Sequence, residues 1–300
     1  MTNLIKVIDL LGVSYKTDEP MKNHTSFKTG GNAALFIEPS DEDELIKVLS
    51  ACAESKIDTF VIGKGSNLLV SDDGIKNRAV IHIAGGMDEI MLVDDTTIKA
   101  GAGASLASLC KFALANSLTG LEFAYGIPGS CGGAAFMNAG AYGGEMKDVL
   151  ISCEHIDKNG VKGSFSGDEL DLSYRHSAYS GSNLIITSLT IKLQKGEKSD
   201  IESKMNELMG RRKDKQPLEY PSAGSVFKRP VGYFAGALIE QSDLKGKMIG
   251  GAMVSKKHAG FIINYDNCTT SDVIELIKHC QKTVKDKFGV DLETEIRFVL

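Results

Sequence analysis

Hydrophobic positions recur with two different periods along the first two-thirds of the chain, and each period predicts its own kind of element. Apolar residues at helical spacing predict a helix over 41–55, with Ser40 as N-cap and Asp43 completing a capping box. A second apolar stripe predicts a helix over 105–117. Short apolar or alternating runs predict strands at 58–63, 79–84, 89–95, 97–103, 149–157 and 183–193.

The last third of the chain follows an expected boundary at Lys195-Gly196. It predicts a helix over about 200–213, capped by Ser199 and Glu202, and another over 271–288 that ends at Gly289.

The final segment, 291–300, alternates as a strand with two different faces does. Its apolar face is expected to carry Leu292, Ile296, Phe298 and Leu300. Glu295 falls on the other face, with Arg297 and Val299. On this pattern alone, a solvated strand edge explains Glu295 better than a functional site.

Composition narrows the class of function. Of the 300 residues, 42% are hydrophobic and 24% charged, as in ordinary globular proteins. The net charge of -5 argues against nucleic acid as the main partner. No apolar run reaches the about 18 residues of a membrane-spanning helix, and no signal peptide is recognised. The six cysteines form no CxxC pair, so we expect a cytoplasmic protein with reduced thiols, no metal site and no membrane partner.

Eight of the 25 residues at 120–144 are glycine. Glycine within regular structure costs about 0.5–1 kcal/mol relative to alanine, so this density needs a reason. One such reason is a close approach of the main chain to a nucleotide or an isoalloxazine, to which Ser130, Asn138 and Tyr142 would add polar contacts. A flexible loop is the alternative, but residues such as Phe136 make the stretch too apolar for a solvated linker.

The segment "GKGSNLLVSD" at 63–72 follows a predicted strand. Glycine permits a positive φ, and consecutive N–H groups then form an anion site to which Ser66 and Asn67 add donors. A tight turn is the better explanation of this motif alone. "TIKAGAGASL" at 97–106 has Leu106 where a dinucleotide fingerprint has its third glycine, so we interpret it as a strand-to-helix turn.

Two further segments place chemistry-bearing side chains in turns. "PSAGSVFKRP" sets Ser225 between a glycine and two cations, although an ordinary turn explains it too. "LSYRHS" holds Arg175, which is able to bind a carboxylate by two parallel hydrogen bonds, although a surface arginine is common. His176 is expected to be structural. Lys213 and Lys215 are expected in a loop, either solvated or facing an anionic substrate.

Together, six segments resemble one family. "NHTSFKTGG", "GKGSNLLVSD", "GIPGSCGGAAFMNAGAYGGE", "YRHS", "AGSVFKRP" and "ETEIRF" have the order and spacing typical of bacterial UDP-N-acetylenolpyruvoylglucosamine reductases, over about 23–300. The first three also resemble the vanillyl-alcohol-oxidase-type FAD-binding superfamily. "YRHS" runs directly into a strand, which resembles the short type II form without an inserted tyrosine loop. Cys131 departs from the family pattern, where a β-branched residue is expected, and is interpreted as a packing position.

The resemblance implies a flavoenzyme of peptidoglycan precursor synthesis. NADPH would reduce bound FAD and leave, and the enolpyruvyl ether of UDP-N-acetylglucosamine would then enter the same cleft. A hydride from flavin N5 would reach the vinyl carbon, and Ser225 would protonate the neighbouring carbanion. Arg175 and Glu295 would flank the substrate carboxylate. Other contacts to the sugar or diphosphate are expected from Tyr174, Lys215 and Arg229.

The implied fold is α+β, of the vanillyl-alcohol-oxidase/PCMH type. It comprises an FAD-binding region at 1–195, with lobes at about 1–56 and 57–195, and a substrate-binding domain at 196–300 whose strand 291–300 returns a catalytic carboxylate to the site. FAD contacts are expected at Gly63, Lys64, Gly65, Ser66, Asn67, Leu68, Gly126, Ile127, Pro128, Gly129, Ser130, Gly133, Ala134, Asn138, Gly140 and Ala141.

NADPH has no dinucleotide-binding domain of its own, because no complete fingerprint exists. We therefore expect it to share one cleft with the UDP-sugar, in a monomer or weak oligomer. Two alternatives remain open. An FAD oxidase of a sugar or hydroxy acid would not need Ser225, Arg175 and Glu295 together, and a non-catalytic nucleotide-binding module would not bind flavin.

Overall fold

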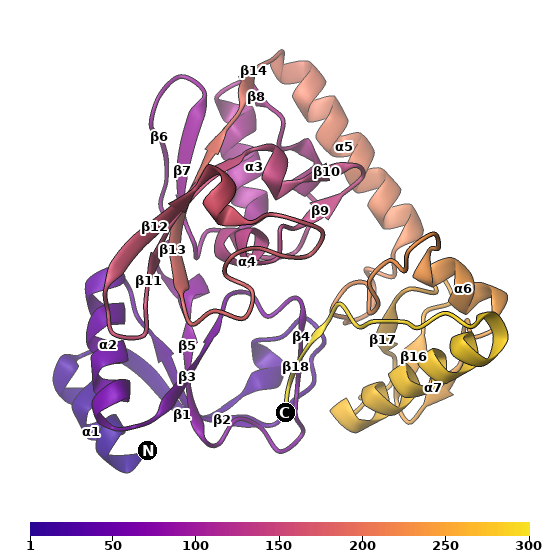
Figure 1. The fold of residues 1–300 in the computed structure, drawn as a ribbon, viewed down its shortest axis with the longest axis horizontal. Coiled ribbons are helices and arrows are strands. Elements are labelled where there is room, and N and C mark those ends of the chain that lie inside the picture. Colours follow the sequence, from indigo (N-terminus) through magenta and orange to yellow (C-terminus); the bar gives the residue numbers. More distant parts are fainter. The chain divides into compact units, whose positions relative to one another are not determined.

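The computed structural model describes all residues, 1–300 (Figure 1). They form two compact units, each with its own hydrophobic core. Unit 1 consists of Met1–Thr17, Leu35–Lys64 and Asn77–Arg211. Unit 2 consists of Asp18–Ala34, Gly65–Lys76 and Arg212–Leu300. Unit 2 therefore takes two short segments from the first half of the chain, and unit 1 continues past the boundary expected at 195–196.

One sheet of unit 1 has four strands in the order β1-β2-β5-β3, with β5 parallel to both β2 and β3. These strands are β1 (Ser14–Pro20), β2 (Asn32–Glu38), β3 (Asp58–Ile62) and β5 (Arg78–His82). Helices α1 (Thr2–Leu11) and α2 (Glu42–Glu54) pack against each other and bury Leu4, Ile8 and Val48.

The other sheet of unit 1 is antiparallel, in the order β12-β11-β13-β7-β6 (Figure 1). Its strands are β6 (Ile90–Leu92), β7 (Thr97–Gly101), β11 (Leu150–Ile156), β12 (Lys162–Ser166) and β13 (Ile185–Lys192). Helix α4 (Cys131–Phe136) packs on β7 and β13 and on α3 (Leu106–Ala115). The glycine-rich stretch is therefore ordered, and ends in a hairpin of β9 (Gly140–Ala141) and β10 (Gly144–Glu145).

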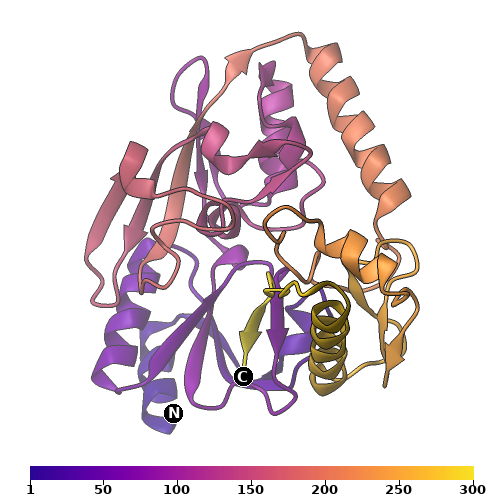
Figure 2. The ribbon, with the colours of Figure 1, turned by 45° about the vertical axis from the view of Figure 1, so that its right-hand side comes forward.

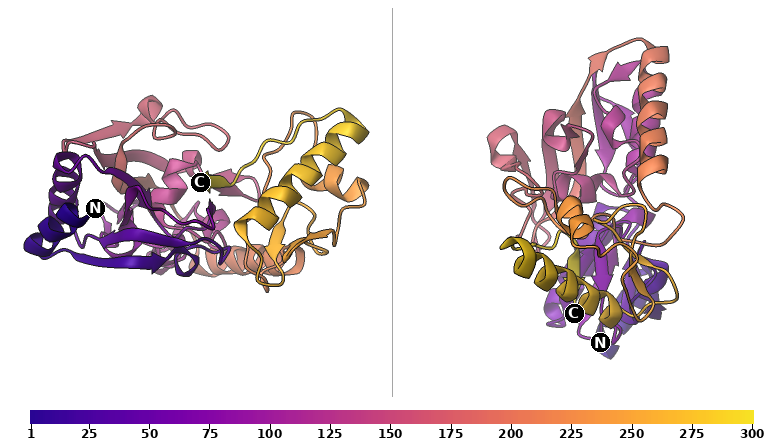
Figure 3. Two further views of the ribbon diagram at one scale, coloured as in Figure 1. Left: turned by 90° about the horizontal axis from the view of Figure 1, so that it is seen from below. Right: turned by 90° about the vertical axis from the view of Figure 1, so that its right-hand side faces the viewer.

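Unit 2 contains a small antiparallel sheet, β15-β16-β17, on which helix α7 packs (Figure 3). Its elements are β15 (Met248–Ile249), β16 (Ala252–Val254), β17 (Ile262–Asn264), α6 (Ala235–Gln241) and α7 (Thr270–Phe288). In the same unit, β18 (Arg297–Val299) pairs in parallel with β4 (Leu68–Val70) (Figure 2).

The remaining elements complete the fold. Strand β8 (Leu118–Thr119) pairs with β14 (Gln194–Lys195), and α5 (Lys198–Lys215) carries the chain from unit 1 into unit 2. The 3-10 helices are η1 (Met21–Asn23), η2 (Ile83–Gly85), η3 (Glu122–Ala124), η4 (Met146–Asp148) and η5 (Gly167–Leu170). No helix combines the length and the apolar character needed to cross a membrane.

The predicted helices exist, but some of their ends differ. The N-cap of α2 is Asp41 and not Ser40, because the Asp41 carboxylate accepts a hydrogen bond from Glu44 N at 2.8 Å. Ser40 N instead donates to the Glu44 carboxylate at 2.8 Å. The expected loop at Lys213 and Lys215 is wrong, since both residues lie in the last turn of α5, where cations suit the helix dipole.

Helix α1 was not predicted, although its sequence signs are present. Leu4 and Ile8 lie one helical turn apart and are fully buried, and Gly12 ends the helix in the left-handed region.

The alternation expected over 291–300 holds for only part of that segment. Leu292 and Ile296 are buried as predicted, but Phe298 is 37% exposed and Val299 only 3%. The pattern reverses because the segment changes partners: Thr294 pairs with Phe227, whereas Arg297–Val299 pair with β4. Each partner imposes its own side-chain orientation.

Candidate active site

Ser225 lies on a short extended segment in the middle of unit 2. Its neighbour Val226 donates from N to Gly260 O at 2.9 Å, and Ser225 itself forms an antiparallel bridge with Phe261. Gly224 precedes it with φ 78°, a left-handed conformation that glycine adopts without strain. A turn followed by a fixed strand therefore holds the Ser225 hydroxyl.

Glu295 lies beside this segment. Its main-chain nitrogen donates to Val226 O at 2.7 Å, and on the next residue pair Phe227 bridges Thr294. Lys228 N donates in turn to Glu293 O at 2.8 Å. The structure thus brings two of the three predicted catalytic residues, Ser225 and Glu295, to adjoining positions within unit 2.

Asn67 connects the predicted FAD-binding turn to the segment that carries Glu295. The Asn67 side-chain nitrogen donates to Glu295 O at 3.1 Å, and Arg297 N donates to Asn67 O at 2.9 Å. Leu68, which follows, begins β4 and is buried. The Asn67 side chain therefore holds protein main chain, a contact that no local pattern of residues predicts.

The "NHTSF" segment, which contains His24 and Ser26, packs against the main chain of Gly65. A Cβ at this position would lie 2.0 Å from His24 O, and the residue has φ 59°. Ser26 N donates to Gly65 O at 3.2 Å. Within unit 2, main chain thus packs directly on main chain at the "GKGS" turn, which leaves no room for a side chain.

Two predicted FAD-binding segments meet within unit 1. A Cβ on Gly63 would lie 2.2 Å from Ser130 Oγ, which itself accepts from Gly133 N at 3.2 Å. Pro128 and Gly133 are exposed on the second segment. Bare main chain from two glycine-rich segments is what a flat cofactor with a pyrophosphate requires, so these residues fit FAD.

Cys131 is a packing residue, as expected. It is fully buried at the start of α4, and burial raises the pKa of its thiol to about 12. The thiol therefore stays protonated and unreactive.

Arg175 lies in a tight turn of unit 1 in which Ser173 and His176 bond each other's main chain. Arg175 has φ 57°, its Nη2 donates to Gly140 O at 3.4 Å, and its guanidinium lies 5.1 Å from the Tyr174 ring centre. The structure thus brings the predicted Arg175, Tyr174 and Gly140 together.

Asn138 uses its side chain within the protein. It is fully buried, and its amide bonds Glu145, Lys147 and Ser173. Only its main chain remains for the predicted contact with the cofactor. Tyr142, another candidate polar contact, lies under Arg211, whose guanidinium is 4.9 Å from its ring centre.

The predicted substrate contacts Lys215 and Arg229 are exposed on unit 2. Arg229 stacks on Phe234, with 4.5 Å between the guanidinium and the ring centre. Phe234 is 63% exposed and follows a turn in which Tyr233 N donates to Pro230 O. Sequence reasoning missed Phe234; an aromatic pair directly after a Pro-Val-Gly turn was the available sign.

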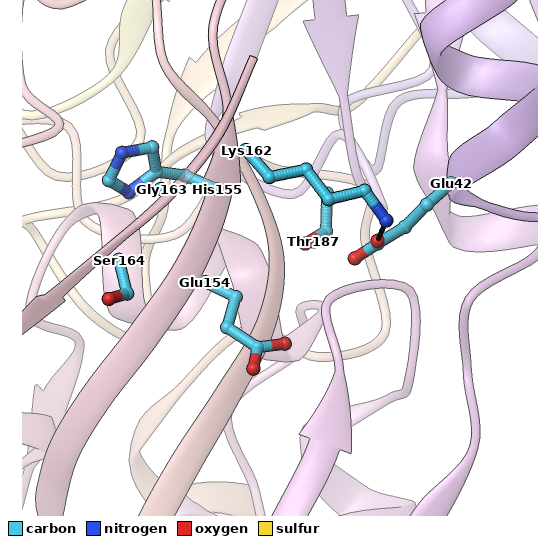
Figure 4. Close-up of a pocket in the computed structure, with 7 residues that line it drawn as sticks. All are labelled: Glu42, Glu154, His155, Lys162, Gly163, Ser164 and Thr187. Atoms are coloured by element: carbon cyan, nitrogen blue, oxygen red, sulfur yellow. Dashed lines mark hydrogen bonds and ion pairs between the residues drawn. The ribbon is translucent and has the colours of Figure 1, made fainter. Parts of the chain in front are cut away.

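A polar pocket of about 360 Å³ lies elsewhere in unit 1 (Figure 4). Its lining consists of Glu42, Glu154, His155, Lys162, Gly163, Ser164 and Thr187. Figure 4 shows Lys162 reaching toward Glu42, with 2.5 Å between Nζ and Oε2. Burial acts to raise the pKa of Glu42, but hydrogen bonds from Lys162 and Thr187 and the charge of Lys162 together lower this pKa. No predicted site residue lines this pocket.

Family models match two parts of the chain. Residues 33–162 match an FAD binding domain, and residues 216–299 match the C-terminal domain of UDP-N-acetylenolpyruvoylglucosamine reductase. Relatives named UDP-N-acetylenolpyruvoylglucosamine reductase include one from Caldanaerobacter subterraneus subsp. tengcongensis, 51% identical over 94% of this chain and 92% of its own. Another, from Clostridium perfringens strain SM101, is 45% identical over 100% of this chain and 99% of its own.

Solved structures confirm the predicted α+β fold with its FAD-binding region. The crystal structure of UDP-N-acetylenolpyruvylglucosamine reductase from Thermus caldophilus matches with a TM-score of 0.81 and 34% identity, over 96% of this chain and 99% of that one. A berberine bridge enzyme variant matches with a TM-score of 0.50 and 16% identity over 66% of this chain and 44% of that one, a likeness of fold alone. The chain, with its FAD binding domain, therefore belongs to the UDP-N-acetylenolpyruvoylglucosamine reductase family.

Proposed function

We propose that this protein reduces UDP-N-acetyl-3-O-(1-carboxyvinyl)-glucosamine to UDP-N-acetylmuramate in peptidoglycan precursor synthesis, with FAD as its cofactor and NADPH as reductant. The observation that carries the proposal is the pairing of Glu295 with the Ser225 segment. Ser225 and Glu295 lie on paired neighbouring segments, and an alcohol and a carboxyl group suit the protonation of a carbanion next to a carboxylate. Because UDP-sugars and NADPH are cytoplasmic metabolites, we place the reaction in the cytoplasm.

When bound, FAD would supply the two-electron redox chemistry that links NADPH to the vinyl carbon of the substrate. The carbon next to the substrate carboxylate then needs a proton. Ser225 gives that proton from Oγ and recovers one from solvent. An alcohol is a weak acid, but a carbanion is basic enough to accept its proton, and such general acid catalysis contributes about 10²–10⁴-fold. Glu295 hydrogen-bonds the enol form of the substrate.

Arg175 neutralises the charge that builds on the substrate carboxylate. Its guanidinium has Gly140 O and the Tyr174 ring as neighbours, which limits its freedom before substrate arrives. Donors held in place in this way contribute about 3–4 kcal/mol each in known sites.

Main chain of two segments holds the cofactor in this proposal. These are Gly63–Leu68 and the stretch from Gly126 through Gly129, Ser130, Gly133 and Ala134 to Asn138, Gly140 and Ala141. The support is the close approach of Gly63 to Ser130 and of Gly65 to His24, where no side chain fits.

Tyr174, Lys215 and Arg229 contact the sugar or diphosphate in this proposal, and we add Phe234 to them. The exposed pair of Arg229 and Phe234 offers a cation for a phosphate and a ring face for uracil. NADPH uses the same cleft before the UDP-sugar enters. We expect a monomer or weak oligomer.

The test uses purified protein under anaerobic conditions. We expect a yellow, flavin-containing protein that oxidises more than about one equivalent of NADPH per flavin only when the enolpyruvyl substrate is added, and a product with two more hydrogens by mass spectrometry. NADPH oxidation that needs oxygen and ignores this substrate would instead indicate an oxidase.

A further inference from the structure

We propose that Asn138 is a positioning residue for Arg175, so that its side chain serves the substrate carboxylate indirectly. This inference rests on the proposed function, in which Arg175 binds that carboxylate. It assigns to the Asn138 side chain a role different from the cofactor contact that the sequence suggested, which is left to the main chain.

Asn138 satisfies every hydrogen-bonding group of its side chain inside unit 1. Its Nδ2 donates to Ser173 O at 2.9 Å and to Glu145 Oε2 at 2.8 Å, and its Oδ1 accepts from Lys147 N at 2.8 Å. The residue is 0% exposed, so no bond to solvent replaces a lost one. An amide is required here, because two acceptors and one donor face it.

The bond to Ser173 fixes the turn that carries Arg175. This turn is short, since Ser173 N donates to His176 O and His176 N donates to Ser173 O. Arg175 within it has φ 57°, a conformation that costs a non-glycine residue free energy and persists only when surrounding contacts impose it. Ser177 Oγ, which donates to Phe136 O at 2.5 Å, provides a second attachment just after the turn.

The bonds to Glu145 and Lys147 fix the hairpin that contains Gly140, whose carbonyl oxygen contacts the Arg175 guanidinium. Glu145 belongs to β10, which pairs with β9, and Gly140 of β9 accepts from Arg175. One side chain thus fixes both the turn from which Arg175 projects and the strand that its guanidinium contacts. Asn138 itself has φ 45°, a left-handed conformation that asparagine tolerates better than most residues.

The main test replaces Asn138 by glycine. Asn138→Gly keeps the left-handed backbone without strain and removes all three side-chain bonds. A matched control is Asn116→Gly, which removes a bond from another side-chain amide of unit 1 to Phe112 O at 2.8 Å. Arg175→Ala and the double variant complete a mutant cycle.

Stopped-flow measurements separate the two half-reactions. We expect Asn138→Gly to slow the oxidation of NADPH-reduced enzyme by the enolpyruvyl substrate about 100-fold, as misplaced groups do. In the Arg175→Ala background the same change should alter that rate by no more than about 2-fold, because the residue acts through Arg175. Flavin reduction by NADPH does not involve the substrate carboxylate, so Asn138→Gly should slow it far less than the substrate half-reaction.

Hydrogen exchange gives a readout that needs no catalysis. Main-chain amides at 173–177 should exchange faster in Asn138→Gly and not in Asn116→Gly. Asn138→Asp provides a second variant, because aspartate keeps the volume and tolerates the left-handed conformation but turns oxygen toward Ser173 O and Glu145. It should slow the substrate half-reaction at least as much as glycine does.

Three results would overturn the proposal. They are equal slowing by Asn138→Gly in both backgrounds, unchanged exchange at 173–177, and wild-type behaviour of Asn138→Asp. If Arg175→Ala itself left the substrate half-reaction unchanged, the role proposed for Arg175 would fall together with this inference. Slowing by Arg175→Ala without an effect of Asn138→Gly would overturn the inference alone.

Discussion

The main-chain nitrogen of Glu295 donates a hydrogen bond of 2.7 Å to the carbonyl oxygen of Val226. This bond joins the end of the chain to the segment that carries Ser225. Because the next residue pair, Phe227 and Thr294, also bridges, the register between the segments is set by main chain. The relation of Ser225 to Glu295 therefore does not depend on a flexible side-chain contact.

Removing the Ser225 hydroxyl should separate the two half-reactions. In Ser225→Ala, flavin reduction by NADPH should stay nearly intact, because that step needs no proton from Ser225. Reduction of the enolpyruvyl substrate should slow about 10²–10⁴-fold, the range of general acid catalysis. Anaerobic stopped-flow spectroscopy measures both rates.

Ser222→Ala, on the same segment, is the control for Ser225→Ala and should leave both rates unchanged. Equal slowing of both half-reactions in Ser225→Ala would show that Ser225 shapes the site and does not donate the proton.

Gly65 should tolerate no side chain. In Gly65→Ala, the Cβ would lie 2.0 Å from His24 O, so the turn must shift. We expect a loss of about 1–3 kcal/mol in the free energy of unfolding, as for overpacked sites, and a lower flavin content. Urea unfolding and the absorbance ratio of flavin to protein measure these effects.

Gly167→Ala separates steric overlap from backbone strain. Gly167 has φ 51°, close to the 59° of Gly65, but a Cβ there meets nothing within 4 Å. This control should lose stability only through its left-handed backbone and keep its flavin. If the two variants behaved alike, close packing at Gly65 would not be the reason for its glycine.

Local pattern was enough to predict most of the long elements. Helix α7 is an example, since its apolar spacing, the capping box of Thr269 with Asp272 and the left-handed Gly289 all lie within or next to the helix. The six motifs also predicted the family, which the relatives confirm.

Contacts between distant segments were not predictable in the same way. The reversal of the face pattern at Phe298 follows from pairing with β4, and the bonds of Asn138 to Ser173 depend on how two loops fold together. In both cases the residues that contact each other lie far apart in the sequence. The capping error at Ser40 was local, because Asp41 offers an equally suitable side chain one position later.

Phe234 should contribute to binding of the UDP-sugar. If its exposed ring stacks on uracil, Phe234→Ala should raise KM for the enolpyruvyl substrate by about 10-fold or more, since stacking of a base on an aromatic ring contributes about 1–3 kcal/mol. The rate of flavin reduction at saturating NADPH should not change. Val231→Ala removes a 98% exposed apolar side chain from the same turn and should leave KM unchanged. An equal rise of KM in both variants would contradict a specific role for the ring.

The N-terminus of α7 should make stability sensitive to acid. The Asp272 carboxylate accepts hydrogen bonds from Thr269 N at 2.9 Å and Gly251 N at 3.2 Å, and these bonds lower its pKa. Because the folded pKa lies below the unfolded value of about 3.9, the bonds stabilise the fold fully above about pH 5 and are lost as the pH falls through the folded pKa. Asp272→Asn should therefore lower the free energy of unfolding by about 0.5–2 kcal/mol at pH 7, as the loss of a helix cap does, and by less at pH 3. Urea unfolding at both pH values measures the difference, with Asp73→Asn, a variant of another exposed carboxylate of unit 2, as control. A loss of equal size at both pH values would show that the charge of Asp272 does not stabilise the helix.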